Sequence, residues 1–240
     1  MRTFVIGDIH GAYISLQQCL ERSGFDFEKD KLISVGDIVD GWRFVKDCVD
    51  LLLTIPNRVM VVGNHDWWFI EYFMRGKRDS LWTSQGGDAT LESYHDGIPE
   101  EHKTFFKTMI PTYVDNNKIY VHGGFDPSQP IAIQSIHDIM WDRALFSISK
   151  TLEFKHGKDY KISQYDEIFI GHTQVRSTVP LHYCNLWNMD TGAGWNGYLT
   201  IMNVDTKEFW NSDYVLETYH GENGRASAEF KMMLHRGEID

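Results

Sequence analysis

The chain has 240 residues, 42% of them apolar and 24% charged, a composition typical of an ordinary globular domain with a sizeable core. Its formal charge of −11, without a visible basic stripe, excludes a general affinity for DNA or RNA backbones, so any phosphate binding must be local. A membrane span needs roughly 20 consecutive apolar residues, and because no run approaches that length we expect no membrane partner. Three widely spaced cysteines without a Cys-x-x-Cys pair, and an N-terminus without a signal-peptide pattern, predict a cytoplasmic protein.

Three apolar runs near the start of the chain predict buried strands, at residues 3–6, 31–35 and 58–62. Residues 15–20 and 44–53, which lie between these runs, have the spacing of amphipathic helices. A strand–helix–strand–helix–strand order predicts a mostly parallel sheet. Ligands collect at the carboxyl ends of the strands of such sheets, so the residues that follow each run are candidate site residues.

Each predicted strand is followed by glycine and then by side chains that can bind a metal ion. Asp8 and His10 are two residues apart on an extended backbone, so they point the same way and can hold one cation, although such a pair is also common in plain turns. We predict that Asp37, after the second strand, bridges two metal ions. After the third strand, Asn64 can supply a neutral carbonyl oxygen. Its neighbour His65 is either free for proton transfer or a surface histidine at a helix start.

Three blocks in order, Gly-Asp-Ile-His-Gly (7–11), Gly-Asp-Ile-Val-Asp (36–40) and Gly-Asn-His-Asp (63–66), resemble the signature of calcineurin-like metallophosphoesterases. The match is closest to bacterial and phage-type serine/threonine phosphatases, with diadenosine tetraphosphatases as a related branch. The resemblance implies an α/β fold, a metallophosphoesterase β-sandwich of two mixed sheets flanked by helices, with a dimetal site at the carboxyl ends of the strands.

The same resemblance predicts how the chain is divided. We expect one metallophosphoesterase domain over residues 1–214, with a helical insert at about 67–110 that caps the site or simply packs its aromatic residues in a core. Residues 186–204 resemble the closing hairpin of the second sheet. Residues 215–240 would form a C-terminal tail, in which 226–234 carry a short helical signal. The sequence carries no signal of oligomeric state.

Later blocks complete the implied metal site. Residues 118–125 and 167–173 each read as a strand followed by a histidine, and the resemblance makes His122 and His172 ligands of the second metal. The implied ligands are Asp8, His10 and Asp37 for one cation, and Asp37, Asn64, His122 and His172 for the other. Carboxylate, imidazole and amide donors favour manganese, with iron and zinc as alternatives.

The implied reaction is hydrolysis of phosphomonoesters, with phosphoserine or phosphothreonine in proteins, or a small phosphoester, as substrate. A hydroxide that bridges the two metals would attack phosphorus, while His65 acts as general acid and Asp40 orients its imidazole. Arg143 stands where bacterial relatives have an arginine that clamps the phosphoryl group, and Asn64 would also lie beside the substrate.

The chain departs from the family pattern at one position. Phosphoprotein phosphatases usually continue Asp-Arg-Gly after the second block, whereas here Asp40 is followed by Gly41, Trp42 and Arg43. Either Arg43 compensates, Arg143 works alone, or the substrate is not a phosphoprotein.

Three alternative functions therefore stay open. The first is a dinucleoside tetraphosphate hydrolase in which Trp42, Trp67 or Trp68 stacks on a base. The second is a cyclic-nucleotide or RNA-end phosphodiesterase. The third is a non-catalytic metal-binding scaffold that presents the aromatic insert to a partner.

Overall fold

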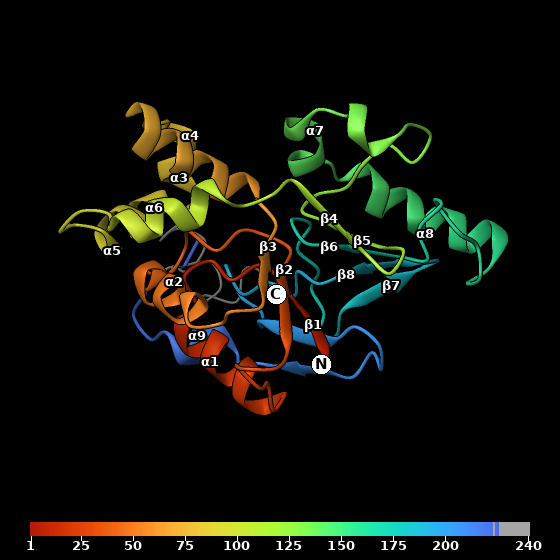
Figure 1. Ribbon diagram of the computed structural model, residues 1–240, viewed down its shortest axis with the longest axis horizontal. Helices are drawn as coiled ribbons and strands as arrows, with labels where there is room; N and C mark the ends of the chain where they lie inside the picture. Colours follow the sequence, from red (N-terminus) through yellow and green to blue (C-terminus); the bar gives the residue numbers. More distant parts are fainter. Residues whose placement is uncertain (223, 226–240) are drawn as a thin grey trace, which may run out of the picture.

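Two five-stranded sheets form the centre of the molecule (Figure 1). We describe residues 1–222 and 224–225 of a computed structural model, so the helical signal expected at 226–234 lies outside the described residues. The first sheet has the order β10-β9-β1-β2-β3, and the second has the order β4-β5-β6-β8-β7. The strands of the first sheet are β1 (Thr3–Ile6), β2 (Lys31–Ser34), β3 (Arg58–Met60), β9 (Thr200–Asn203) and β10 (Phe209–Asn211). Those of the second are β4 (Thr112–Asp115), β5 (Lys118–Val121), β6 (Glu167–Ile170), β7 (Leu181–Tyr183) and β8 (Leu186–Asn188).

Each sheet combines parallel strand pairs with antiparallel pairs toward its edges. β1, β2 and β3 pair in parallel, and β9 joins β1 antiparallel. In the second sheet β5, β6 and β8 pair in parallel, with β4 and β7 antiparallel at the edges. The predicted parallel core and the predicted pair of mixed sheets are therefore confirmed.

The hairpin expected over residues 186–204 is not formed. β8 belongs to the second sheet, whereas β9 crosses to the first sheet and pairs antiparallel with β1. The glycine-rich turn between them, which includes Gly192 at φ +93°, reverses the chain but does not specify which sheet receives the next strand.

Apolar residues at every second position fill the space between the sheets. Val5 and Ile33 come from the first sheet, and Tyr120 and Phe169 come from the second. The rings of Tyr120 and Phe169 stack with their centroids 5.0 Å apart. The alternate residues of the same strands face outward, where helices cover them.

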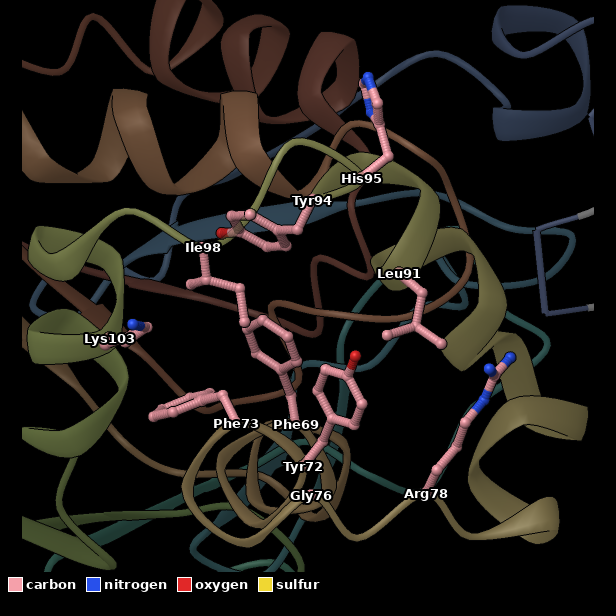
Figure 2. Close-up of a pocket in the computed structure, with 11 residues that line it drawn as sticks. Phe69, Tyr72, Phe73, Gly76, Arg78, Leu91, Tyr94, His95, Ile98 and Lys103 are labelled. Carbon is pink, nitrogen blue, oxygen red and sulfur yellow. The ribbon is translucent and has the colours of Figure 1, made fainter.

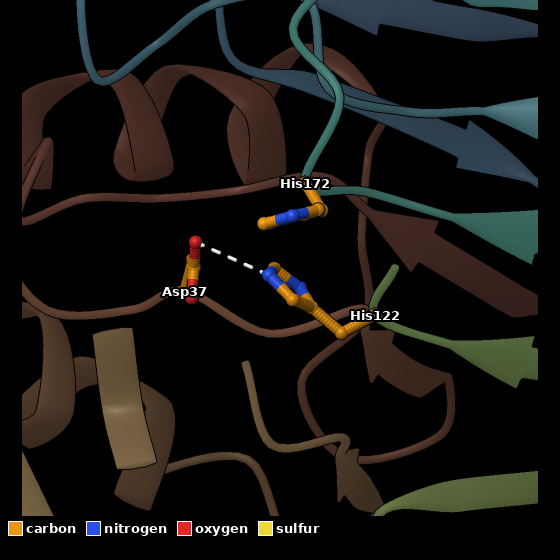
Figure 3. Close-up of side chains that lie close together, drawn as sticks. All are labelled: Asp37, His122 and His172. Atoms are coloured by element: carbon orange, nitrogen blue, oxygen red, sulfur yellow. Dashed lines mark ion pairs between the residues drawn. The ribbon is translucent and has the colours of Figure 1, made fainter. Parts of the chain in front are cut away.

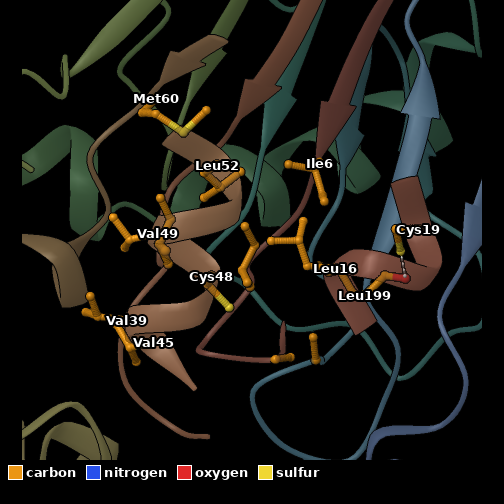
Figure 4. Packing of buried hydrophobic residues seen from close by; sticks show 14 of the residues in the cluster. Ile6, Leu16, Cys19, Val39, Val45, Cys48, Val49, Leu52, Met60 and Leu199 are labelled. Carbon is orange, nitrogen blue, oxygen red and sulfur yellow. Dashed lines mark hydrogen bonds between the residues drawn. The ribbon is translucent and has the colours of Figure 1, made fainter. Parts of the chain in front are cut away.

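Helices α1 (Tyr13–Arg22) and α2 (Val45–Leu53) cover the outer face of the first sheet. Their apolar faces, with Leu16 and Leu52 among them, pack on Ile6 (Figure 4). Cys19 and Cys48 are buried in this layer as free thiols, in the role of small apolar side chains. Helices α7 (Ile136–Trp141) and α8 (Ala144–His156) cover the second sheet, preceded by a short 3₁₀ turn, η2 (Ile131–Ile133).

A helical segment follows β3 and stands at one side of the sandwich (Figure 1). Its elements are α3 (Asn64–Arg75), α4 (Ser80–Trp82), the kinked turn η1 (Thr83–Gly87), α5 (Asp88–Ser93) and α6 (Glu100–Lys107). Aromatic side chains of this segment, with Phe69, Tyr72 and Tyr94 among them, line a pocket of about 680 Å³ (Figure 2). The last described helix is α9 (Val215–Thr218). None of the helices in residues 1–222 and 224–225 combines the length and the apolarity that a membrane span requires.

Candidate dimetal centre

The residues singled out in the sequence blocks meet where strands of both sheets end. Asp8 and His10 follow β1, Asp37 and Asp40 follow β2, and Asn64 and His65 open α3 directly after β3. His122 and His172 follow β5 and β6 of the second sheet. All eight side chains are buried, none more than 6% exposed. The site is thus built from chain segments that the parallel strands bring to one edge.

Backbone strain accompanies this arrangement. His10, Asp37, Asp40 and His172 all have left-handed backbones, with φ between +51° and +67°. Such conformations cost about 1–3 kcal/mol each for residues other than glycine and persist only where the surroundings enforce them. Here the carbonyl oxygen of Asp37 accepts hydrogen bonds from the backbone N–H groups of Ile9 and His10, both at 2.9 Å. The loops after β1 and β2 therefore hold each other in place.

Two groups of potential ligand atoms share Asp37. Asp8, His10 and Asp37 form one group, and Asp37, His122 and His172 form the other (Figure 3). Within each group the ligand atoms all lie within 4.8 Å of one another. Asn64 belongs beside the second group, because its Oδ1 lies 3.1 Å from His122 Nε2.

The donor atoms fit two divalent cations. Among the described residues, Asp8 Oδ1 and His172 Nε2 are buried without a hydrogen-bond partner, which is costly unless another group satisfies them. The Nδ1 atoms of His10 and His122 lie 2.9 and 2.8 Å from the backbone carbonyls of Val39 and Val35. A ring that donates from Nδ1 to a carbonyl turns an unprotonated Nε2 toward the centre, as metal-binding histidines do.

The pKa values of the imidazoles differ with their surroundings. Burial, followed by the charge of Arg225, lowers the pKa of His10 to about 3. Burial, followed by the charge of His122, lowers the pKa of His172 to about 2. Burial also opposes the charged form of His122, but the carboxylate of Asp37, 3.2 Å away, raises the pKa of His122 to about 9. Two of the three rings are therefore neutral, as ligands must be, and a cation would displace the proton of the third.

His65 and Asp40 form a second functional unit beside the ligands. His65 Nδ1 lies 2.6 Å from Asp40 Oδ2, and the rings of His65 and His10 are 5.1 Å apart. Burial raises the pKa of Asp40 and lowers the pKa of His65, because both charged forms are disfavoured there. His65 and Asp40 therefore share a proton across a short contact, and this contact lies next to the proposed metal ligand His10.

Asp40 is itself held by the helical segment. Thr90 Oγ1 donates to Asp40 Oδ1 at 2.6 Å, and Trp82 Nε1 donates to Asp40 Oδ2 at 2.8 Å. Sequence reasoning did not single out Thr90 or Trp82, since both lie more than 40 residues from Asp40 and no local pattern marks them. Asp66 stabilises the loops after β2 and β3, because its carboxylate accepts hydrogen bonds from the backbone N–H groups of Asp37, Ile38 and Gly63.

The two arginines named as candidates lie in different environments. Arg143 Nη1 donates to the carbonyl of His172 at 2.8 Å, which sets the guanidinium next to the second group of ligands. Arg43 is half-exposed, and its guanidinium pairs with Glu222 at 3.1 Å.

The three tryptophans named for base stacking also differ. Trp42 is fully buried, stacks on Tyr219 with centroids 4.6 Å apart and donates from Nε1 to the carbonyl of Ala193. It is therefore excluded from stacking on a base. Trp67 is 39% exposed. Trp68 lies against His65 and Trp141, at 5.0 and 5.1 Å between ring centroids, so these indoles form an aromatic wall beside the site.

A sandwich of two mixed sheets that gathers two carboxylate–imidazole groups around one shared aspartate is the arrangement expected of a dimetal phosphoesterase. The family model of calcineurin-like phosphoesterases matches residues 1–212, and the chain belongs to this family. It is accordingly a member of a metal-dependent phosphoester hydrolase family, as the sequence blocks indicate.

Individual relatives agree with this assignment. Serine/threonine-protein phosphatase 1 of Salmonella typhimurium is 26% identical over 210 residues, which is 84% of this chain and 91% of the relative. The symmetrical bis(5'-nucleosyl)-tetraphosphatase of Dechloromonas aromatica is 39% identical, but only over 87 residues, 34% of this chain and 32% of the relative. A metallophosphoesterase from Sphaerobacter thermophilus has a similar fold, with a TM-score of 0.56 at 19% identity over 100% of this chain and 95% of that one.

Proposed function

We propose that the protein hydrolyses phosphomonoesters in a reaction that depends on two divalent cations, with phosphoserine and phosphothreonine in proteins as its substrates. The observation that carries the proposal is the contact between the two ligand groups around Asp37 and the buried His65–Asp40 pair. A scaffold that only bound metal would have no need of such a pair. The named phosphatase relative supports the phosphoprotein substrate, because it matches 84% of the chain whereas the tetraphosphatase matches 34%.

In this proposal Asp8, His10 and Asp37 hold one cation, and Asp37, Asn64, His122 and His172 hold the other. Two cations bound there would neutralise charge on the phosphoryl oxygens and activate a water molecule. The mixture of carboxylate, imidazole and amide donors favours manganese, with iron and zinc as alternatives.

The remaining roles belong to side chains around the ligands. His65 donates a proton from Nε2 to the departing oxygen, since its Nδ1 is engaged by Asp40. Arg143 donates N–H groups to a phosphoryl oxygen on the side of His172. Arg43 would first have to leave Glu222 before it contacted a substrate. Asn64 can turn its amide N–H toward the phosphoryl group while its oxygen stays with the ligands.

The test is the ratio of kcat/KM for a phosphothreonine peptide to kcat/KM for diadenosine tetraphosphate, measured with one manganese-loaded preparation. A ratio well above one is expected. A ratio well below one would instead indicate dinucleoside polyphosphates as the substrates, with a base stacked against Trp68 and Trp141. Absence of metal-dependent hydrolysis of either substrate, and of phosphate release from a chromogenic monoester, with manganese, iron or zinc, would favour the scaffold.

A further inference from the structure

A cationic side chain far along the sequence, that of Arg225, lies against the first group of ligands. Arg225 Nη1 is 3.2 Å from His10 Nε2, the atom that His10 offers to a cation, although the two residues are 215 positions apart. Arg225 Nη2 donates to Gln85 Oε1 at 3.1 Å, and the ring of Trp195 lies 5.3 Å from the guanidinium carbon. The backbone N–H of Arg225 donates to the carbonyl of Gly194 at 2.8 Å. Arg225 thus has a defined position at the ligands and is not a loose surface group.

Three glycines leave room for the stem of this side chain. A Cβ atom added at Gly41 or at Gly86 would lie 3.2 Å from Arg225 Cγ, and one added at Gly194 would lie 3.0 Å from Arg225 Cδ. These distances are shorter than ordinary contacts between side chains. Gly41 and Gly86 have φ values of +108° and +103°, which side-chain-bearing residues rarely adopt. The absence of a side chain at position 41 therefore leaves space that the stem of Arg225 occupies.

Two residues shortly before Arg225 are attached to the loop that follows Gly41. The ring of Tyr219 stacks on Trp42 at 4.6 Å, and Glu222 pairs with Arg43 at 3.1 Å. Both contacts involve residues directly after Gly41, so the segment that carries Arg225 is packed on the same loop as Asp40. This explains what the exposed Arg43 does in the structure: it holds Glu222, three residues before Arg225.

One donor of Arg225 lacks an acceptor. Its Nε is buried without a hydrogen-bond partner among the described residues. A guanidinium presents five N–H groups in a planar fork that matches two oxygens of a phosphate or carboxylate. A guanidinium beside two metal cations is electrostatically unfavourable unless an anion lies between them.

We propose that Arg225 is a phosphoryl-binding residue, which enters the site from the C-terminal tail through the space that Gly41 leaves open. The inference rests on the proposed function and deepens it. Arg143 donates to the backbone carbonyl of His172 in the second group of ligands, and Arg225 contacts His10 in the first, so each group has a guanidinium beside it. A phosphoryl group between them would accept hydrogen bonds from both, and the arginine missing at position 41 would be replaced by one 184 positions later in the chain.

The test compares Arg225→Ala and Arg225→Lys with Arg75→Ala, a change at an exposed arginine whose ion pair, in the described part of the chain, is with Glu71 on the same helix. The probe is inorganic phosphate, whose binding to the manganese-loaded proteins is measured by calorimetry, with a manganese titration of the metal-free proteins alongside. We expect Arg225→Ala to weaken phosphate binding about 10- to 100-fold, because a charge-assisted fork is lost. Arg225→Lys should recover part of the loss, since it restores the charge but not the fork. Arg75→Ala should bind phosphate like the wild type.

Two results would overturn the inference. One is unchanged phosphate affinity in Arg225→Ala. The other is tighter manganese binding together with faster hydrolysis of a phosphomonoester by that variant. This result would mean that Arg225 competes with the first cation for its site. Thermal unfolding of the metal-free variants checks that each is folded. The outcome is separate from that of the proposed function, because phosphate binding in the wild type can be intact even where no phosphomonoester is hydrolysed.

Discussion

Replacement of Thr90 by valine tests how the helical segment supports the catalytic pair. Thr90 Oγ1 donates to Asp40 Oδ1 at 2.6 Å and accepts from the backbone N–H of Asp40 at 2.9 Å, and both residues are fully buried. Valine keeps the shape of threonine and removes both hydrogen bonds. Oδ1 of Asp40 then keeps the hydrogen bond from Trp82 Nε1, at 3.0 Å, whereas the backbone N–H of Asp40 loses its bond to Thr90.

The expected cost follows from these two losses. A hydrogen bond to a carboxylate contributes about 1.5–3 kcal/mol, and a buried N–H left without a partner costs about 1–3 kcal/mol. Because part of the loss is recovered by relaxation, we expect Thr90→Val to lower the free energy of unfolding by about 3 kcal/mol. Turnover should fall about tenfold, since Asp40 becomes less well placed to orient His65.

The assay is urea unfolding of the metal-free protein, together with turnover of a chromogenic phosphomonoester by the manganese-loaded protein. Thr104→Val is the matched control, because the exposed hydroxyl of Thr104 donates to the carbonyl of Glu100 in the same helix. This control should change the free energy of unfolding by no more than about 0.5 kcal/mol. If Thr90→Val behaved like Thr104→Val in both measurements, the proposed support of Asp40 by the helical segment would be refuted.

Two further predictions concern the acid and the second sheet. His65→Asn should retain both cations and lose about 10²–10⁴-fold in turnover, less on an activated ester whose leaving group needs no proton; equal losses on activated and unactivated esters would remove His65 from the role of acid. Burial acts to raise the pKa of Glu167, but Lys118 and Lys207, at 2.8 and 2.6 Å, hold that pKa below its ordinary value of 4.5. The ion pairs therefore stabilise the fold above about pH 4.5, and their contribution is lost as the pH falls. Glu167→Gln should lower the free energy of unfolding by about 1 kcal/mol at pH 7 and by less at pH 3, and a loss that is equal at both pH values would contradict this account.

The sequence predicts those parts of the molecule in which a local pattern of residues also determines where the segment lies in the fold. Each run of apolar residues that became β1, β2, β3, β5 or β6 ends at the edge where ligands collect, so the site residue that follows each strand, directly or after a glycine, could be named in advance. Cytoplasmic location and a C-terminal tail beyond residue 214 stay predictions.

The features that the sequence did not predict depend on contacts between segments that are distant in the chain. Thr90 and Trp82 reach Asp40 only because the helical segment folds back over the loop after β2. Trp42 looked available for a base, but stacking on Tyr219 buries it. Arg225 approaches His10 across 215 positions, and no periodicity or motif relates two such residues. Partners of this kind follow from tertiary packing, which a pattern along the chain does not encode.

The most direct test of the account is the number of manganese ions bound per chain in the wild type, in Asp8→Asn and in Asp37→Asn. Because Asp37 belongs to both groups of ligands whereas Asp8 belongs to one, we predict about two ions in the wild type, about one in Asp8→Asn and a loss of both high-affinity sites in Asp37→Asn. Elemental analysis after equilibrium dialysis measures these values, and circular dichroism checks that each variant is folded. Two tightly bound ions in a folded Asp37→Asn variant, or the same single-site loss in both variants, would contradict the claim that Asp37 bridges the two cations.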